Sequence, residues 1–418
     1  MSGHRDPDPE FKAWVERAKA GSFETAMAIC GFRPAKGFEN AKDRSGPCPN
    51  CGGRDRFSVL MTARKFNCRK CEAKGLNAVS LAMVGDRISF LDACRELTGE
   101  DPPRADCRES AEEKAERERR RAAQDRKNAE DAARAVQEQN AYRERERAAC
   151  HRIWGRGRAP TRDGLGRYYA ARNILLPSTA LIREADNVAF FHGEEIDDRG
   201  QKQPRVIYRG PAQLAAMLDN DGQFVGLHIT HLAPDWCGKA EIFCPETGEL
   251  LNAKKMRGSK KGTHIVVRQP DIPQEIVYPS GTREVRMFLG EGNETVVSVG
   301  TALKKTGKMR LLDTFWGSGD LGNLGGPNKG TISHPTAKTE KGRPVRVPSA
   351  EPDFTAPGIL IPDYVTHLFL LGDGDSEPFL TRTTLERARR RYARPGLWIG
   401  TLMADDGRDF NDMVRAGV

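Results

Sequence analysis

The sequence contains no uninterrupted apolar run of about 18 residues, so we expect no membrane-spanning helix and no membrane partner. Its first residues, Met1-Ser2-Gly3-His4-Arg5-Asp6, lack an apolar core, and we therefore expect no signal peptide. A P-loop is also missing. Six residues separate the glycines of the Gly300 to Lys308 segment where four are required, and Met309 stands where Ser or Thr is needed. We therefore expect no helicase motor in this chain.

Nothing in the sequence marks secretion, which argues against a disulfide framework. Six of the ten cysteines are irregularly spaced, as expected for reduced thiols in a cytoplasm. They are Cys30, Cys94, Cys107, Cys150, Cys237 and Cys244. A length of 418 residues predicts two or three domains, and 38% hydrophobic residues still allow packed cores. The net charge of +9 suits a nucleic-acid partner without being diagnostic of one.

The other four cysteines form two close pairs. Cys48-Pro49-Asn50-Cys51 is followed, after sixteen residues, by Cys68-Arg69-Lys70-Cys71. This spacing is typical of a zinc ribbon, because two residues between cysteines allow a tight turn that aims both sulfurs at one metal ion. Four thiolates satisfy tetrahedral Zn²⁺ and leave no open position. The pattern therefore predicts one structural zinc ion, held by all four cysteines.

The segment around these cysteines is basic. Nine Lys and Arg face three acids between Lys42 and Lys74, and the formal charge of −2 on a four-thiolate zinc centre still leaves +4. This balance favours a polyanionic partner, and we expect Arg54, Arg56 and Lys65 to contact it. Two interpretations of Phe57 and Phe66 are open. They could stack on unpaired bases, or they could fill the small core of the ribbon.

A charged segment without glycine or proline runs from Arg108 to Ala149. Acids stand four residues before bases, as in Glu113–Arg117 and Glu130–Arg134, an order that supports a solvated helix. An apolar stripe is nearly absent, so the helix should bury little surface. Fully helical, it would span on the order of 60 Å. We interpret it as a semi-rigid spacer; a disordered linker is the alternative, and its balanced charge makes a nucleic-acid-binding arm less favoured.

Carboxylates follow two short apolar runs that have the character of buried parallel strands. Val285 to Gly290 runs into Glu291, and His367 to Gly372 runs into Asp373-Gly374-Asp375. A third apolar run, Trp398 to Met403, precedes Asp405-Asp406-Gly407-Arg408-Asp409. The carboxyl ends of parallel strands meet in one crevice, where such acids can hold divalent cations. Asp-Gly-Asp alone is often a solvated turn, which remains the alternative.

This repeated order of strand, acid and helix resembles the Toprim domain, the catalytic fold shared by bacterial-type primases, topoisomerases and some nucleases. The resemblance covers about residues 280 to 418. It implies that Glu291 is the general acid or base and that Asp373 and Asp375 hold Mg²⁺ or Mn²⁺, with Glu291, Asp406 and Asp409 as further ligands. Two departures are visible: Thr295 replaces a frequent aspartate, and Ser376-Glu377-Pro378 replaces a frequent Ala-Gly.

The cysteine segment looks like the zinc-binding domain of phage and plasmid primases, and residues 153–278 loosely resemble the first half of a primase core. The resemblance includes a Tyr-x-x-x-Arg helix at Tyr168 to Arg172. A basic segment within that half could hold template phosphates or a nucleotide triphosphate, while a surface loop without a ligand is the alternative. The binding candidates in that segment are Lys254, Lys255, Arg257 and Lys260.

Together these resemblances imply a DNA primase that makes short RNA primers on single-stranded DNA from nucleoside triphosphates. We expect it to serve phage, plasmid or mobile-element replication, to work with a separate replicative helicase and to lie in the cytoplasm of a bacterial or phage-infected cell. A Toprim nuclease and a non-catalytic, zinc-dependent subunit that binds single-stranded DNA are the alternatives. A type I topoisomerase would need a large gate domain with a nucleophilic tyrosine and is disfavoured at this length.

The predicted fold class is α/β: a small zinc ribbon, a long charged helical linker, and an α+β primase core with a C-terminal parallel-sheet Toprim domain. The sequence divides into four segments on this interpretation. They are an N-terminal helix and zinc ribbon at 1–105, the linker at 106–152, the basic first part of the core at 153–278, and the catalytic domain at 279–418.

Overall fold

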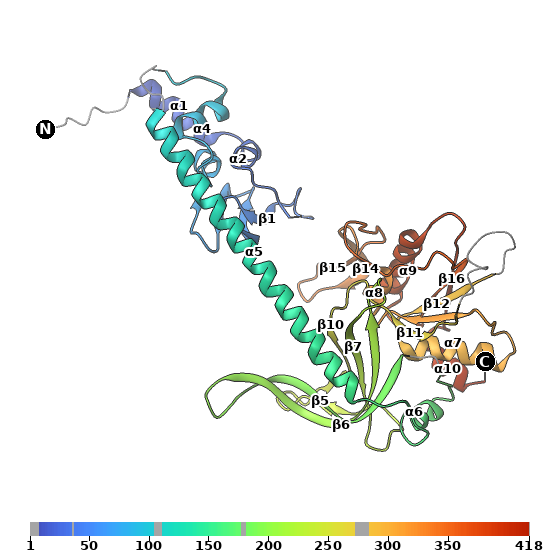
Figure 1. Cartoon of the computed structure of the whole chain (residues 1–418). Helices are drawn as coiled ribbons and strands as arrows, with labels where there is room; N and C mark the ends of the chain where they lie inside the picture. The colour runs from blue at the N-terminus through green and yellow to red at the C-terminus, as the bar shows by residue number, and fades with distance from the viewer. Residues whose placement is uncertain (1–7, 36, 104–110, 177–180, 272–283, 418) are drawn as a thin grey trace. The chain divides into compact units, whose positions relative to one another are not determined.

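The computed structural model describes residues 8–35, 37–103, 111–176, 181–271 and 284–417. They belong to two compact units, an N-terminal unit (Met1–Asn140) and a C-terminal unit (Ala141–Val418) (Figure 1). Both contain helices and strands, so the broad α/β prediction is confirmed. The four-segment division stays a prediction, since the boundary between the units lies inside the proposed linker. Among the described helices, none is both long and apolar enough to cross a membrane.

The N-terminal unit packs short helices against a four-stranded antiparallel sheet of order β1-β2-β3-β4. Its strands are β1 (Asp43–Cys48), β2 (Gly52–Leu60), β3 (Lys65–Cys68) and β4 (Lys74–Gly75). Its helices are α1 (Pro9–Ala20), α2 (Phe23–Cys30), α3 (Ala78–Ala82), α4 (Phe90–Thr98) and the start of α5 (Ala111–Arg156). Ser22 and Ser89 cap α2 and α4 by accepting hydrogen bonds from the backbone N–H groups three residues on, which satisfies donors that the helix leaves open.

Apolar side chains from these helices and strands form one core. Phe57 and Phe66 are 0% and 4% exposed and lie 5.6 Å apart between ring centroids. Phe32 packs edge-on against Phe57 at 5.0 Å. Neither ring can reach an unpaired base, so the stacking interpretation of Phe57 and Phe66 is wrong. A core of this size depends on each of its large apolar side chains for stability, because a small unit buries little other apolar surface.

Helix α5 is continuous from Ala111 to Arg156. Its first part packs on the N-terminal unit, where Asn128 Nδ2 donates to the carbonyl of Asn50 at 2.7 Å. Its last turns belong to the C-terminal unit, with Cys150 fully buried and Trp154 packed near Phe224. Most of its remaining side chains are exposed, as expected from the missing apolar stripe. Its role as a spacer stays a prediction.

The C-terminal unit contains two larger sheets. The first is antiparallel, in the order β10-β7-β6-β5. Its strands are β5 (Ile182–Ile196), β6 (Lys202–Leu218), β7 (Phe224–His231) and β10 (Lys254–Gly258). The turn at Asp219 to Gln223 joins β6 to β7 in an antiparallel hairpin. A small hairpin, β8 (Ile242–Phe243) with β9 (Leu250–Leu251), lies in the connection from β7 to β10.

The second sheet has five strands in the order β11-β13-β12-β16-β17. Four of them run parallel, and only β11 is antiparallel to its neighbour. The strands are β11 (Ile265–Arg268), β12 (Arg286–Gly290), β13 (Thr314–Gly317), β16 (His367–Gly372) and β17 (Trp398–Met403). Helices α7 (Asn293–Lys305), α8 (Leu321–Gly325), α9 (Pro378–Tyr392) and α10 (Phe410–Arg415) accompany them. A further hairpin, β14 (Thr331–Lys338) with β15 (Pro344–Pro348), lies in the connection from α8 to β16.

Alternation along β12 divides the core around this sheet into two faces. Phe288 stacks on Phe315 at 4.8 Å and on Phe369 at 4.9 Å, so three neighbouring strands share one aromatic row. Met287 and Leu289 point to the other face, in a cluster with Leu385 of α9. The register pairs Leu289 with Leu370, which brings the carboxyl ends of β12 and β16 to the same edge.

A buried carboxylate fixes helix α6 (Leu165–Ala171) beside the first sheet. Glu184 of β5 is 0% exposed and accepts hydrogen bonds from Thr161 N at 3.0 Å and Leu165 N at 2.8 Å. Arg158 Nε donates to the same carboxylate at 3.0 Å. A Cβ at Gly164 would collide with Glu184, so only glycine allows the chain to pass here. Glu184 therefore supplies the acceptors that the start of α6 lacks.

Replacing this carboxylate should destabilise the C-terminal unit strongly. Glu184→Ala leaves several buried donors without an acceptor, and we expect a loss of about 2–4 kcal/mol in the free energy of unfolding. Urea unfolding followed by circular dichroism measures it. Glu195→Gln, an exposed substitution on the same strand, is the matched control and should change stability by less than about 0.5 kcal/mol. Equal effects of the two substitutions would contradict the role given to Glu184.

Candidate functional site

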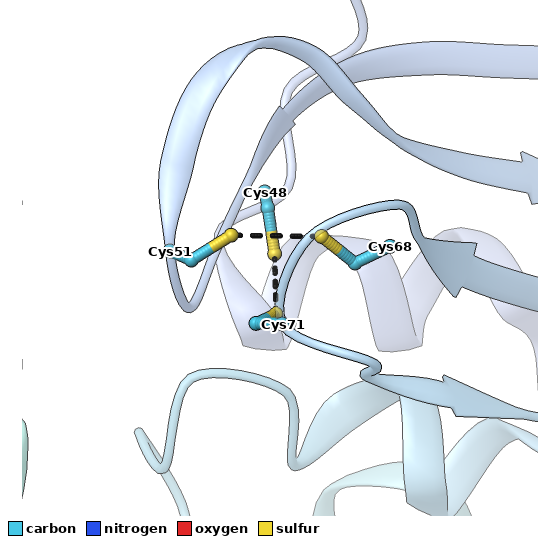
Figure 2. A group of neighbouring side chains, drawn as sticks. All are labelled: Cys48, Cys51, Cys68 and Cys71. Atoms are coloured by element: carbon cyan, nitrogen blue, oxygen red, sulfur yellow. Dashed lines mark hydrogen bonds between the residues drawn. The ribbon is translucent and has the colours of Figure 1, made fainter.

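The four paired cysteines come together at one end of the N-terminal sheet. Cys48 ends β1 and Cys51 precedes β2, while Cys68 ends β3 and Cys71 lies between β3 and β4. Antiparallel pairing of β2 with β3 places both turns at the same end. Figure 2 shows the four sulfur atoms pointing toward one another, and all lie within 4.8 Å of each other.

Their spacing fits a tetrahedral metal ion. The Cys48–Cys71 and Cys51–Cys68 sulfur pairs are 3.6 and 3.5 Å apart. Four sulfurs at about 2.3 Å from a zinc ion would lie about 3.8 Å from one another, which is close to these values. The backbone N–H of Lys70 also points at Cys68 Sγ at 3.4 Å, where it would stabilise a thiolate. The cluster therefore suits zinc without rearrangement.

The three basic residues that the sequence predicted to contact a polyanion, Arg54, Arg56 and Lys65, lie at the surface of the N-terminal unit. Arg54 and Lys65 are exposed, and Arg56 is half-buried. Nearby, Arg69 is paired with Asp55 at 3.4 Å, an exposed ion pair of little energetic weight. These side chains are accessible to a polyanion, but nothing in their arrangement selects one.

A cavity of about 390 Å³ in the C-terminal unit brings residues from both of its larger sheets together. The parallel sheet contributes Glu291 after β12 and Asp373 and Asp375 after β16. Asp409 also lines the cavity, whereas Asp406 is exposed and does not. The remaining lining comes from the loop after β13, from the start of α7, and from β7, β10 and the segment that joins them.

Burial, reinforced by neighbouring acids, raises the pKa of two carboxyl groups in this cavity. Burial is the main cause that raises the pKa of Asp373 to about 6. The carboxylates of Glu291 and Asp409 add to the effect, and a hydrogen bond from Thr295 Oγ1 at 3.1 Å opposes it. Burial also raises the pKa of Glu291, reinforced by Asp320. A group that is costly to ionise in this way becomes easier to ionise beside a cation.

The carboxylates line one cavity, but their oxygen atoms do not converge on a single position. In the part of the chain that the structure describes, no three of them have oxygens within 4.8 Å of one another. Mg²⁺ usually keeps several waters and takes only one or two protein carboxylates, so wide spacing of the carboxylates around one cavity is compatible with a hydrated ion. The residues present therefore fit a divalent cation held partly through water.

Glu294, in the first turn of α7, is the opposite kind of carboxylate. Although burial raises its pKa, Lys254, Lys239 and Arg172 more than offset this and hold the pKa at about 2. Lys239 Nζ lies 3.3 Å and Lys254 Nζ 3.7 Å from it. Tyr168 donates to it at 2.8 Å and Arg172 at 3.3 Å. Glu294 is therefore ionised at neutral pH and fixes two lysines at the cavity wall.

The basic segment of β10 divides between the cavity and other partners. Lys254 and Lys255 line the cavity. Arg257 instead pairs with Glu146 of α5 at 3.0 Å, within the C-terminal unit. Lys260 pairs with Asp320 at 2.5 Å and lies outside the cavity lining. Of these four predicted cations, Lys254 has its ammonium beside a cavity carboxylate, whereas the ammonium of Lys255 lies over the ring of Phe190.

Sequence reasoning missed four cavity residues: Lys239, His228, Glu294 and Asp320. Asp320 follows β13 much as Glu291 follows β12, so the rule that an acid after a strand marks the site could have found it. Burial lowers the pKa of His228 to about 4, which leaves it neutral beside Lys254. No sequence pattern around Lys239 predicted its place in the cavity, because the long connection from β7 to β10 brings it there.

A larger cavity of about 780 Å³ lies between α7 and β13. Apolar side chains such as Val296 and Phe315 contribute much of its lining, and none of its described lining residues is a carboxylate. It offers no carboxylate ligand, so the smaller cavity is the candidate site for a divalent cation.

Residues 144–267 match one family, described as a domain of unknown function, DUF7146. The match covers the end of α5, α6, the antiparallel sheet and most of β11. No curated protein matches this chain.

Several solved structures of primase domains are similar to the chain at low identity. The zinc-binding and RNA polymerase domains of the Aquifex aeolicus primase are 12% identical with a TM-score of 0.30, over 96% of this chain and 82% of that one. A DnaG primase catalytic domain bound to ssDNA is 11% identical with a TM-score of 0.32, over 66% and 78%. The E. coli primase catalytic core is 13% identical with a TM-score of 0.24, over 53% of each chain. These TM-scores are too low to support an inference about function. Any functional proposal therefore rests on the geometry of the site.

Loss of the cysteine cluster should remove one zinc ion per chain. Cys48→Ser together with Cys68→Ser takes away two of four ligands, and we expect the variant to bind one zinc equivalent fewer than the unmodified chain in plasma emission analysis. Because metal binding is coupled to folding in so small a module, its thermal stability should also fall. Cys30→Ala, a buried cysteine outside the cluster, is the control and should keep the full zinc content.

The raised pKa of Asp373 predicts a stability effect that depends on pH. The folded chain binds this proton up to about pH 6, whereas an unfolded chain releases it near pH 4, so this group costs stability as the pH rises through 6. Asp373→Asn should therefore raise the free energy of unfolding by about 1–2 kcal/mol at pH 7.5 without metal, and the gain should vanish near pH 4.

Thermal unfolding across this pH range checks the sign. Mg²⁺ should stabilise the unmodified chain above pH 6 more than below it, since the ion competes with the proton. An Asp373→Asn variant less stable than the unmodified chain at pH 7.5 would show that the carboxylate is not held at an electrostatic cost.

Proposed function

We propose that this protein is a DNA primase, which joins ribonucleotides on a single-stranded DNA template by metal-dependent nucleotidyl transfer. The observation that carries the proposal is the single cavity lined by Glu291, Asp373 and Asp375 opposite Lys239 and Lys254. Acids that suit divalent cations face lysines that suit phosphates, which is the pairing that a nucleoside triphosphate with its metal requires. The parallel strands that deliver the acids support the assignment of this region to the Toprim fold.

In the proposed reaction, a 3′-hydroxyl attacks an α-phosphate and pyrophosphate leaves. Bound Mg²⁺ or Mn²⁺ would neutralise phosphate charge and lower the pKa of the attacking hydroxyl. Asp373 and Asp375 would hold the cation, with Asp409 as a further ligand, whereas the exposure of Asp406 makes it a weaker candidate. Glu291, with its raised pKa, would take the proton from the hydroxyl and return it to solvent.

The lysines of the cavity would bind the phosphates. Lys254 and Lys239 are held by Glu294, so their positions are set before a nucleotide arrives. Lys255 also lines the cavity, but its ammonium lies over the ring of Phe190, 4.6 Å from the centroid, and is not assigned to the phosphates. Arg257 and Lys260 pair with Glu146 and Asp320 and do not line the cavity, which leaves them for positioning rather than direct contact. Preset charges cost less reorganisation at the moment of reaction than mobile ones.

The two departures from the primase pattern have structural roles that are compatible with activity. Thr295 keeps a hydrogen bond to Asp373, so it still orients that ligand. Glu377 caps α9 by accepting from Phe379 N and Leu380 N, with Pro378 at the first helical position. The Ser376-Glu377-Pro378 segment therefore starts the helix that follows Asp375 without removing either aspartate.

The cysteine module would bind one structural zinc ion and help to choose the start site on single-stranded DNA. Its exposed Arg54 and Lys65 support a template contact. A separate replicative helicase would open the duplex, since the sequence lacks a P-loop. A role in phage, plasmid or mobile-element replication is part of the same proposal.

Two other functions remain candidates. A Toprim nuclease would use the same acids to cut DNA, and the wide spacing of the carboxylates is compatible with either reaction. A non-catalytic subunit would keep the zinc module and bind single strands without joining nucleotides. The lysines facing the acids favour the primase, because they suit a triphosphate.

The direct test is primer synthesis on defined single-stranded DNA with all four ribonucleotides and Mg²⁺ or Mn²⁺. We expect labelled short RNA products from the unmodified chain, and a loss of at least about 100-fold for Asp373→Asn combined with Asp375→Asn, because both proposed ligands lose their charge. Asp363→Asn, whose side chain is fully exposed and outside the cavity, is the matched control and should keep full activity.

Three results would contradict this assignment. Cleavage of labelled DNA without added nucleotides would indicate the nuclease. Binding to single strands without incorporation under any metal would indicate the non-catalytic subunit. Full primer synthesis by the double variant would remove the aspartates from the mechanism even if the primase activity stands.

A further inference from the structure

The connection from β7 to β10 carries a hairpin that is too small to be stable alone. Strands β8 and β9 have two residues each, paired as Ile242 with Leu251 and Phe243 with Leu250. A two-stranded hairpin is marginal even with longer strands. Ile242 packs into a small cluster with Phe190 of β5, which supplies part of the anchoring.

Three metal-binding side chains lie at the tip of this hairpin. Cys244 and Glu246 belong to its loop, and His192 comes from β5. One ligand atom from each lies within 4.8 Å of the other two. Cys244 is buried, His192 is half-buried and Glu246 is exposed, so an ion could enter from the Glu246 side. Cys244 carried no signal in the sequence beyond that of an ordinary thiol.

The hydrogen bonds among these side chains resemble those of a metal site in which a proton takes the place of the metal ion. Cys244 Sγ donates to Glu246 Oε2 at 3.2 Å, so one proton lies between sulfur and oxygen. Arg205 donates to the other oxygen, Oε1, and orients the carboxylate. Metal-bound carboxylates are commonly hydrogen-bonded on their free oxygen in this way. A cation could replace the shared proton without moving Arg205.

We propose that His192, Cys244 and Glu246 bind a second zinc ion, separate from that of the four-cysteine cluster. Imidazole, thiolate and carboxylate are all zinc ligands, and the thiolate disfavours Mg²⁺ and Ca²⁺. Three protein ligands leave one tetrahedral position, which water fills. Binding releases the thiol proton of Cys244.

The ion ties the hairpin loop to β5 and so limits the freedom of the whole connection. The start of the same connection carries Lys239, whose segment pairs with Leu232 and is held by a hydrogen bond from Tyr208 to the Leu232 carbonyl. Fixing the far end of the connection therefore supports a cavity lysine from a distance. The metal site itself does not depend on the proposed primase activity.

Zinc content at saturation tests the proposal in the full chain. After equilibrium dialysis against excess Zn²⁺ and plasma emission analysis, His192→Ala and Cys244→Ser should each bind one zinc ion fewer than the unmodified chain. Cys237→Ser, a cysteine of the same connection outside the cluster, is the matched control and should lose none. Circular dichroism in the presence of a chelator confirms that the variants share the fold of the unmodified chain.

The difference in zinc content decides the question. A loss of one equivalent in both variants, with none in Cys237→Ser, supports the site, and Glu246→Gln should weaken binding of the same equivalent. Unchanged zinc content in His192→Ala and Cys244→Ser overturns it. Calorimetric titration in two buffers of different ionisation enthalpy provides a second measurement: release of about one proton with the second zinc is expected, and its absence would exclude Cys244 as a ligand.

Discussion

The candidate cavity of the C-terminal unit is organised around one buried negative charge, the carboxylate of Glu294. An ionised group at 9% exposure is stable only if cations and donors surround it, and here they come from separate parts of the chain. Tyr168 and Arg172 arrive from the α6 region, Lys254 from β10 and Lys239 from the connection before it. The same contacts therefore join α6, the antiparallel sheet and α7 of the parallel sheet around one cavity.

Two carboxylates three residues apart consequently have opposite electrostatics. Glu294 is surrounded by positive charge, and its pKa falls to about 2. Glu291 faces Asp320 and Asp375 after burial has already disfavoured its charge, and its pKa rises. The difference follows from the first turn of α7, which points one side chain toward the lysines and leaves the other at the sheet edge. Such a separation suits a permanent charge for positioning and a titratable group for chemistry.

Much of the fold was predictable because its signals are local. The apolar runs at Val285 to Gly290, His367 to Gly372 and Trp398 to Met403 appear as β12, β16 and β17. The Cys48–Cys51 and Cys68–Cys71 pairs also converge as their spacing indicates. In each case the period of the side chains or the length of a turn contains the information.

Predictions failed or were missing where the outcome depended on a distant partner. The sequence could not decide between stacking and core roles for Phe57 and Phe66, because packing against Phe32 and the other elements of the small core determines their exposure. Asp406 and Asp409 lie three residues apart, yet only Asp409 faces the cavity, since α10 begins directly after it.

The sequence by itself determined the four-cysteine cluster, the parallel strands and the acids at their ends, because these features need only neighbouring residues and strand period. The tertiary structure alone decided which charges meet: Lys239 with Glu294, Lys260 with Asp320, and His192 with Cys244 and Glu246. Side chains that are dozens of residues apart acquire a fixed distance only when packed sheets and their connections close around them.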